Sequence, residues 1–258
     1  MFEEAHWEEL FREGYTVVSG AIDEPTLRTA QAVAAHLNTI HPDGGWERSR
    51  NELWREVRYC RQSEFMAIAA NALDPLAVEI LDSAPPLDFV QLASTLPGFA
   101  TKGGVGRHFH LDGGQDRTLG VFNILFGVAL TPVASDTAGG FHVLPRSHEK
   151  YAAEFQRHLG DPDVHLGQVK LDYQPVLLAD ARRAGPALVV PRLDAGDIIV
   201  THSFVAHGTS NNTSDVRRDM LFQRRAAAPL WDPATQAEAR ATFMRDPWSF
   251  FRKRSARG

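Results

Sequence analysis

The sequence predicts one domain with a jelly-roll core of antiparallel β-strands and supporting α-helices. Apolar residues recur at helical spacing in the first third of the chain, whereas short apolar runs separated by Gly, Pro, Asp and Asn dominate after residue 87. Such runs, without helical patterns between them, are typical of a sandwich or barrel. A chain of 258 residues is long enough for one large domain of this kind.

We expect this domain, 1–258, to have mainly helical support in 1–85, the jelly-roll core in about 86–228 and a helical tail in 229–258. The stretch 151–184 has weak periodicity and is expected to be an insertion over one mouth of the barrel. The core strands are expected in LDFVQLAST, TLGVFNILFGVALT, GFHVLPRS, PALVVPR, GDIIVTHSF and RRDMLFQRRA.

Three elements outside the core are predicted by pattern. A short strand at Tyr15–Val18 precedes a helix that begins near Asp23, whose carboxylate can cap it. A second helical region is expected over 51–80. We expect an interruption near Asp74 and Pro75, because proline has no backbone N–H to donate within a helix.

Composition and charge exclude several classes of protein. Hydrophobic residues make up 43% of the chain and charged residues 23%, as in ordinary globular proteins, and the net charge of -5 gives no reason to expect nucleic acid. The single cysteine, Cys60, cannot form an internal disulfide. We find neither a signal peptide nor the ~18 apolar residues of a membrane span. We expect a cytoplasmic monomer or homodimer that acts on a small molecule, without nucleic acid or membrane.

A candidate metal site is formed by His110 and Asp112 with the distant His207. On an extended backbone, residues two apart point to the same side, so His110 and Asp112 can reach one point while Leu111 packs oppositely. Two imidazoles and one carboxylate suit the non-haem iron(II) oxygenases, because they leave positions open for a co-substrate and dioxygen. An isolated His-x-Asp is also common in polar surface loops, and His108 competes with His110 for the ligand role.

Three other histidines have a simpler interpretation. They are expected to be hydrogen-bonded or exposed rather than metal-binding: His142, His148 and His202.

Arg218 follows His207 by eleven residues, across the polar turn GTSNNTSD. We expect the turn to return the chain as an antiparallel neighbour. Period-two parity then places Arg218 with Met220 and Phe222 on the apolar face, and Arg217 on the polar one. A buried arginine needs an anionic partner. A dicarboxylate ligand would supply one, and an internal salt bridge is the alternative.

These motifs together resemble the phytanoyl-CoA dioxygenase family of iron(II) and 2-oxoglutarate dependent oxygenases. The resemblance covers most of the chain in order, through GYTVVSGAID, HFHLDGG, FNILFGVALTPVASDTAGGFHVLPRSH and LDAGDIIVTHSFVAHGTSNNTSDVRR. It implies a double-stranded β-helix, cupin-like, with iron(II) on His110, Asp112 and His207. It further implies that Arg218 clamps the far carboxylate of the co-substrate 2-oxoglutarate.

Three further positions follow from the motifs or their strands. The resemblance implies that Thr209 assists the clamp and that Gln91 faces the active site from an early core strand. Asn123 shares a strand face with small residues, so its amide can line the pocket or be a hydrogen-bonded amide at the edge of the core.

Two departures from the family pattern stand out. This chain has Arg146 where the family has glycine in a Pro-Gly-Ser-His motif, and the family's lysine-proline pair before the metal motif is missing around Lys102.

The function implied by the resemblance is oxidation of an unactivated C–H bond of a small molecule, in secondary metabolism, with 2-oxoglutarate and O2 converted to succinate and CO2. The carboxylate of Asp112 favours hydroxylation, desaturation or ring closure over halogenation, because related halogenases have a small residue there. Two alternatives remain open. One is a cupin-like metalloenzyme without 2-oxoglutarate, and the other is a non-catalytic jelly-roll binding module.

Overall fold

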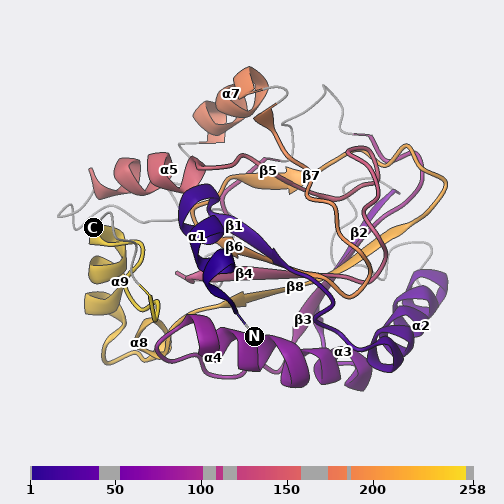
Figure 1. Ribbon diagram of the computed structural model, residues 1–258, viewed down its shortest axis with the longest axis horizontal. Helices are drawn as coiled ribbons and strands as arrows, with labels where there is room; N and C mark the ends of the chain where they lie inside the picture. Colours follow the sequence, from indigo (N-terminus) through magenta and orange to yellow (C-terminus); the bar gives the residue numbers. More distant parts are fainter. Residues whose placement is uncertain are drawn as a thin grey trace.

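Two antiparallel sheets form the centre of the protein in a computed structural model (Figure 1). The structure describes residues 2–40, 53–100, 109–112, 121–157, 174–184 and 187–253. The large sheet has the strand order β1-β6-β4-β8-β3-β2, and the small sheet consists of β5 and β7. The strands are β1 (Tyr15–Val18), β2 (Trp54–Cys60), β3 (Val90–Thr95), β4 (Ile124–Ala129), β5 (Phe141–Val143), β6 (Ile198–His202), β7 (His207–Thr209) and β8 (Arg218–Arg225). The prediction of a mainly antiparallel, jelly-roll fold with supporting helices is confirmed.

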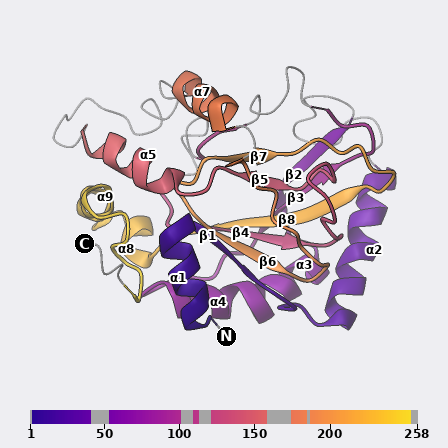
Figure 2. The same cartoon turned by 45° about the horizontal axis from the view of Figure 1, so that its top comes forward.

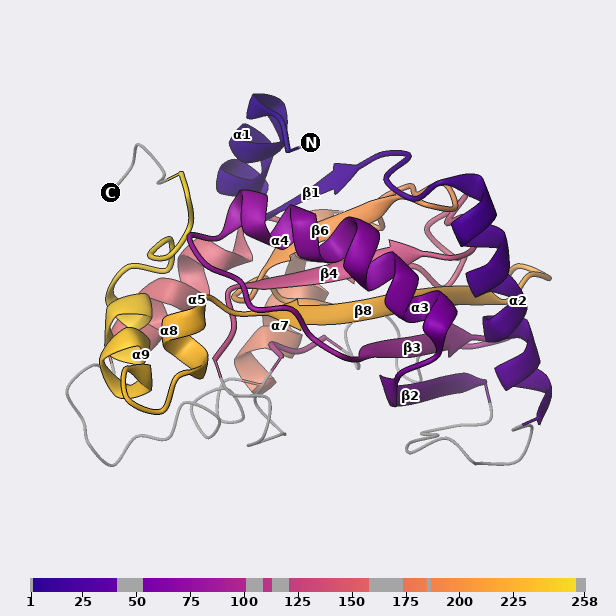
Figure 3. The same ribbon diagram turned by 90° about the horizontal axis from the view of Figure 1, so that it is seen from below.

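The two faces of the large sheet have different neighbours. The inner face is turned toward the small sheet (Figure 2), and Phe222 of β8 contacts Phe141 of β5 with ring centroids 5.8 Å apart. The outer face is crossed by a long helical segment (Figure 3), and Arg225 forms an ion pair with Asp74 of that segment. Alternate residues of β8 therefore point into two environments.

Nine helical elements surround the sheets within the described part of the chain. They are α1 (Glu4–Glu13), α2 (Glu24–Ile40), α3 (Ser63–Ile68), the π-helix η1 (Ala69–Leu73), α4 (Asp74–Ile80), α5 (Ser147–Gln156), α7 (Gln174–Ala184), α8 (Ala228–Trp231) and α9 (Gln236–Arg245). None of the helices described is long and apolar enough to cross a membrane.

The strand at Tyr15–Val18 and the helix after Asp23 are confirmed. β1 pairs with β6 at one edge of the large sheet, with Val17 opposite Ile199. Asp23 accepts a hydrogen bond of 2.9 Å from the backbone N–H of Thr26. This bond lowers the pKa of the Asp23 carboxyl. It satisfies one of the N–H groups left open by the first helical turn.

The prediction of helix across 51–80 is wrong at its start. Trp54–Cys60 forms β2, which pairs with β3 at the other edge of the large sheet, with Val57 opposite Leu92. Aromatic and β-branched residues in this segment fit a half-buried strand, and pairing with β3 outweighs its weak helical pattern. Strand β2 covers an edge of β3 that would otherwise expose unpaired backbone groups.

The expected interruption at Asp74 and Pro75 takes the form of a widened turn. The helical segment runs from Ser63 to Ile80 without a break, but Ala69–Leu73 is π-helical and the N–H of Asp74 donates to the carbonyl of Ala69. The rare π-helix occurs mostly in this form, as a single turn inside an α-helix. Pro75 then lies in the first turn of α4, where its missing N–H costs little.

The stretch expected to be an insertion, 151–184, contains helical structure where it is described. Helices α5 and α7 are connected by an ion pair between Lys150 and Asp180, and by a hydrogen bond of 3.0 Å from Tyr151 Oη to Asp180. Both helices lie on the side of the small sheet that is opposite to α3 and α4 (Figure 1). They form the cover on that side of the molecule.

The expected strand in PALVVPR is present only as isolated bridges. Val189 is bridged to Val143, and the nearby Leu193 is bridged to Val133. The other five predicted segments each contain a strand: β3, β4, β5, β6 and β8.

An aromatic cluster attaches the C-terminal segment to the sheet. The ring of His202 lies 4.6 Å from that of Trp248, and its Nε2 donates to the carbonyl of Pro247 at 2.9 Å. His148 Nε2 donates to the carbonyl of Phe11 at 3.3 Å. His148 and His202 thus have structural partners, as expected.

Candidate metal centre

His110 and His207 are brought together by backbone pairing. The N–H of His110 donates to the carbonyl of His207 at 2.8 Å, and the N–H of His207 returns a bond of 3.1 Å. This reciprocal pair is an antiparallel bridge between the segment 109–112 and β7. The two imidazole rings consequently lie with their centroids 4.6 Å apart. Local backbone geometry thus places two nitrogen ligands side by side.

Asp112 completes a group of three potential metal ligands. His110 Nε2 is 3.2 Å from Asp112 Oδ1, and His207 Nε2 is 3.6 Å from Asp112 Oδ2. One donor atom from each residue lies within 4.8 Å of the other two. Such separations allow all three atoms to reach a common ion. Among the described residues, this is the group of His, Cys, Asp and Glu that could hold a metal.

The ring of His207 is held in a state that suits a metal ligand. Its Nδ1 donates to the carbonyl of Val205 at 2.9 Å, which leaves the lone pair on Nε2, the nitrogen nearest Asp112. The ring also stacks on Phe141 at a centroid distance of 4.9 Å. Burial lowers the pKa of His207 despite the opposing charge of Asp112. A neutral imidazole of fixed orientation results.

Asp112 is held as a carboxylate by a residue that the sequence did not single out, Arg224. Arg224 Nε donates to Asp112 Oδ2 at 2.8 Å. Burial alone would raise the pKa of Asp112, but the charge of Arg224, together with His207 and His110, holds this pKa well below its ordinary value. The signal in the sequence was parity, because Arg224 lies on the same face of β8 as Arg218.

Arg218 points inward, as its parity predicted, and only 2% of its surface is exposed. Its Nε donates to the carbonyl of Gly139, and its Nη1 donates to that of Ala93 at 3.2 Å. Gly139 has φ +71, and a Cβ there would lie 2.1 Å from Thr95 Oγ1, so only glycine brings that carbonyl so close.

The charge of Arg218 has no carboxylate hydrogen-bonded to it among the residues that the structure describes. Asp219, its neighbour in sequence, points to the other face and forms an ion pair with Arg217 at 2.8 Å. Burial lowers the pKa of Arg218 to about 10, although Asp219 opposes this. The alternative of an internal salt bridge is therefore not realised within the described part of the chain.

The three weaker candidates have different surroundings. Thr209 lies two residues after His207 on β7 and shares its face of the strand. Gln91 of β3 accepts a hydrogen bond of 2.7 Å from Arg224 Nη1, which links it to Asp112. Asn123 is fully buried, and its Oδ1 accepts from the N–H of Ala227 at 2.8 Å, so this oxygen supports the backbone. His108 and Lys102 lie outside the described residues.

The turn between β7 and β8 differs from expectation. The two strands are not neighbours: β7 pairs with β5 in the small sheet, and β8 pairs with β3 and β4 in the large one. The turn thus crosses from one sheet to the other, and its Asn212 donates to the carbonyls of Thr95 and Val216. The predicted face of Arg218 is nevertheless correct, because parity depends only on position within β8.

His142 is buried on β5, with its ring centroid 5.1 Å from that of Phe109. Burial lowers the pKa of His142 to about 4, against the opposing charge of Asp136.

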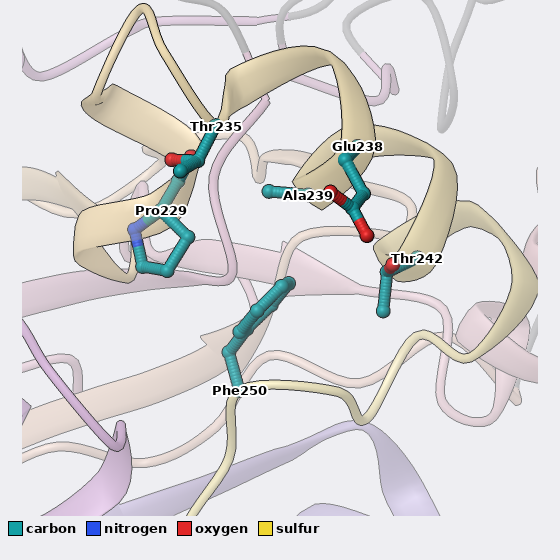
Figure 4. A pocket seen from close by; sticks show the side chains of 6 residues that line it. All are labelled: Pro229, Thr235, Glu238, Ala239, Thr242 and Phe250. Carbon is teal, nitrogen blue, oxygen red and sulfur yellow. The ribbon is translucent and has the colours of Figure 1, made fainter.

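A separate pocket of about 220 Å³ lies among α8, α9 and Phe250 (Figure 4). Its lining is Pro229, Thr235, Glu238, Ala239, Thr242 and Phe250. Glu238 is the only charged residue among them, so this lining offers no group of ligands comparable to the metal centre.

The donor set fits a mononuclear iron site. Two imidazoles and one carboxylate form the facial triad of non-haem iron(II) oxygenases, and the neutral His207 and charged Asp112 are in ligand-competent states. Arg218 adds a buried cation on the inner face of β8. Together, the jelly-roll fold and these residues define a non-haem iron oxygenase.

Comparison with known proteins identifies the family. Residues 11–220 match the model of the phytanoyl-CoA dioxygenase family, so the chain belongs to this family. It is therefore an oxygenase that depends on iron and 2-oxoglutarate. A search of curated proteins finds no significant match.

Solved structures share the fold at low identity. HygX from Streptomyces hygroscopicus, with nickel and 2-oxoglutarate bound, has a TM-score of 0.59 at 15% identity, and the match covers 88% of each chain. SnoK, a non-haem α-ketoglutarate dependent carbocyclase from nogalamycin biosynthesis, has a TM-score of 0.59 at 17% identity over 88% of this chain and 84% of SnoK. EctD from S. alaskensis, in its apo form, has a TM-score of 0.55 at 18% identity over 87% and 77%.

Proposed function

We propose that this protein oxidises a C–H bond of a small molecule at a metal held by His110, Asp112 and His207. The observation that carries the proposal is the convergence of these three side chains, with donor atoms within 4.8 Å of one another. When bound, iron(II) with 2-oxoglutarate would activate dioxygen, which is the oxidant: one oxygen atom would go into the succinate released with CO2, and the other would serve to oxidise the substrate. The protein supplies the placement of the reactants.

Arg218 is proposed to bind the far carboxylate of 2-oxoglutarate. Its guanidinium is buried, and among the described residues its hydrogen bonds go to uncharged backbone carbonyls. A carboxylate would neutralise this charge through a paired, charge-assisted contact. Thr209 shares a face of β7 with His207, which supports a role for its hydroxyl beside the same co-substrate. Gln91 is proposed to face the site through its bond to Arg224.

The substrate is proposed to be a small molecule of secondary metabolism, with hydroxylation as the reaction. The support comes from similar structures: HygX has been crystallised with hygromycin B, and SnoK is from nogalamycin biosynthesis. The carboxylate of Asp112 supports hydroxylation over halogenation.

Succinate release tests this function. The protein, loaded anaerobically with iron(II), is given 2-oxoglutarate and oxygen together with members of a natural-product library. We expect succinate above the substrate-free level for at least one class of compound. A cupin-like metalloenzyme without 2-oxoglutarate would bind metal but form no succinate, and a non-catalytic binding module would retain no metal. Either result would contradict the proposal.

A further inference from the structure

We propose that Arg224 is a positioning residue that restricts Asp112 to binding the metal through one oxygen. This inference rests on the proposed function in that the metal is held by His110, Asp112 and His207. It concerns a residue outside that triad and outside the clamp formed by Arg218.

The two carboxylate oxygens of Asp112 have different surroundings. Oδ2 accepts a charge-assisted hydrogen bond of 2.8 Å from Arg224 Nε, whereas its distance to His207 Nε2 is 3.6 Å. Oδ1 lies on the side of His110, 3.2 Å from its Nε2. An oxygen held by a guanidinium is a poorer partner for a cation, because two positive centres then compete for it. The contact with Arg224 therefore disfavours Oδ2 as a metal ligand, and we assign Oδ1 to the metal.

This difference affects the coordination available to the co-substrate. Two imidazoles and a carboxylate that binds through one oxygen would occupy three of the about six positions that an iron(II) ion offers. Binding through both oxygens would occupy a fourth. A chelating 2-oxo acid needs two positions and dioxygen needs one, so the reaction requires the one-oxygen mode.

Arg224 is itself fixed by the large sheet. It lies on β8, paired with Leu125 of β4, and its Nη1 donates to Gln91 Oε1 on β3 at 2.7 Å. Its side chain is 18% exposed. Asp112, in contrast, belongs to the segment 109–112, which is bridged to the small sheet through His110 and His207. Arg224 thus connects Asp112, on the side of the small sheet, to strand β8 of the large sheet.

The geometry demands arginine at this position. Two different nitrogens of one planar guanidinium reach Asp112 and Gln91 at the same time. A lysine ammonium is a single charged point and has no planar fork to hold both acceptors. Glutamine at position 224 would remove the charge as well.

The test compares Arg224→Gln and Arg224→Lys with Arg217→Lys as a matched control. Arg217, directly before β8, also binds a carboxylate: its Nε lies 2.9 Å from both oxygens of Asp219. This pair lies on the face of β8 opposite to Arg224. The affinity for cobalt(II) is measured by calorimetry without oxygen, and the absorption of bound cobalt(II) reports its coordination. Circular dichroism checks folding.

We expect Arg224→Gln to change the cobalt spectrum, because both oxygens of Asp112 could then reach the ion. We also expect it to weaken cobalt(II) binding by about 10- to 100-fold, because the loss of the contact that orients the carboxylate outweighs the removal of a competing charge. Arg224→Lys should weaken binding less, and Arg217→Lys should match the unmodified protein. If the glutamine variant does not fold, the lysine variant decides the question through the same two measurements.

Unchanged cobalt(II) affinity and spectrum in the folded Arg224 variants would overturn the inference. A raised KM of the Arg224 variants for a substrate that the protein oxidises, with unchanged metal affinity, would also overturn it, because Arg224 would then be a substrate contact. Failure of the proposed function is distinguishable: an unmodified protein that binds cobalt(II) but never forms succinate contradicts the oxygenase, while the metal affinities still decide the role of Arg224. Absence of metal binding in the unmodified protein would overturn both.

Discussion

The two faces of strand β8 each bury an arginine, and the two have different partners. Arg225, 1% exposed on the outer face, forms an ion pair with Asp74 and donates to the carbonyl of Pro85 at 2.7 Å. Arg218, 2% exposed on the inner face, donates only to backbone carbonyls among the described residues. A buried charge is costly unless it is paired. The outer arginine thus has its counter-charge within the protein. The inner one has no carboxylate bonded to it among the described residues, which supports its proposed role as the clamp for 2-oxoglutarate.

The largest effect is expected for Asp112, whose carboxylate accepts a hydrogen bond from Arg224 on the inner face of β8. Asp112→Ala should abolish both metal retention and succinate formation, because one of three proposed ligands is lost. Metal analysis after dialysis and a succinate assay measure this. Asp219→Asn is the control, since Asp219 is a buried carboxylate on the outer face that bonds Arg217. Full succinate formation by the Asp112 variant would reject its role as a ligand.

The two arginines can be compared directly by the same substitution. Arg218→Met should reduce the affinity for 2-oxoglutarate by about 2–5 kcal/mol, as expected when one partner of a buried charge pair is truncated. Its stability without ligand should change little or increase, because an unpaired buried charge is removed. Calorimetric titration and urea unfolding measure the two quantities. Arg218→Lys should also weaken 2-oxoglutarate binding much more than iron binding.

The outer arginine should show the opposite behaviour. Arg225→Met leaves the carboxylate of Asp74, 26% exposed, without its ion-pair partner. We expect a loss of about 3 kcal/mol in the free energy of unfolding, at the low end for a broken buried pair because Asp74 retains some contact with water. Urea unfolding gives this value. A stability loss in Arg218→Met as large as that in Arg225→Met would remove the distinction between the faces.

Part of this arrangement could be predicted from sequence, and part could not. The inward direction of Arg218 followed from period-two parity. The convergence of His110 with Asp112 was predicted from the same rule and is present, although Asp112 lies in a turn rather than on a strand. Arg224 has the same parity, but its partner Asp112 lies 112 residues away, and only the packed sheets bring the two together. Local patterns determine the face on which a side chain lies, whereas its partner across the fold depends on topology.

The edge strand of the large sheet and the connection between the two sheets also could not be predicted from the sequence. Trp54–Cys60 has too weak a pattern to distinguish strand from helix, and its pairing with β3 decides its structure. The crossing of the turn after β7 from the small to the large sheet was likewise missed, because a polar turn is compatible with a hairpin and with a crossover.

The small sheet offers a further test of how the protein handles buried charge, through His142. Its pKa of about 4 lies below the ordinary 6.5, so between these values the folded chain binds fewer protons than the unfolded chain. Stability present above about pH 6.5 should therefore be lost as the pH falls toward 4. Urea unfolding across this range should show the loss, and His142→Gln should reduce it. An unchanged slope in that variant would assign the effect to other groups.

The smallest effect is expected for an arginine on neither face, Arg146. It has φ +64, in the left-handed region, and stands at the glycine position of the family's usual Pro-Gly-Ser-His motif. That conformation costs a residue with a side chain about 1–2 kcal/mol, and glycine avoids this cost. Part of the gain from a glycine is lost, because glycine has more conformational freedom in the unfolded chain. Arg146→Gly should therefore raise the free energy of unfolding by about 0.5–1 kcal/mol. A decrease measured by urea unfolding would show that Arg146 contributes contacts that outweigh its backbone cost.

The most direct test of the account is an anaerobic titration of 2-oxoglutarate into the iron(II)-loaded protein, followed by visible absorption. We predict the weak charge-transfer band of a chelated 2-oxo acid in the unmodified protein and in Arg225→Met at concentrations where Arg218→Met shows none. A band of equal intensity and midpoint in all three proteins would contradict the claim that the inner face of β8 keeps a buried charge for the co-substrate.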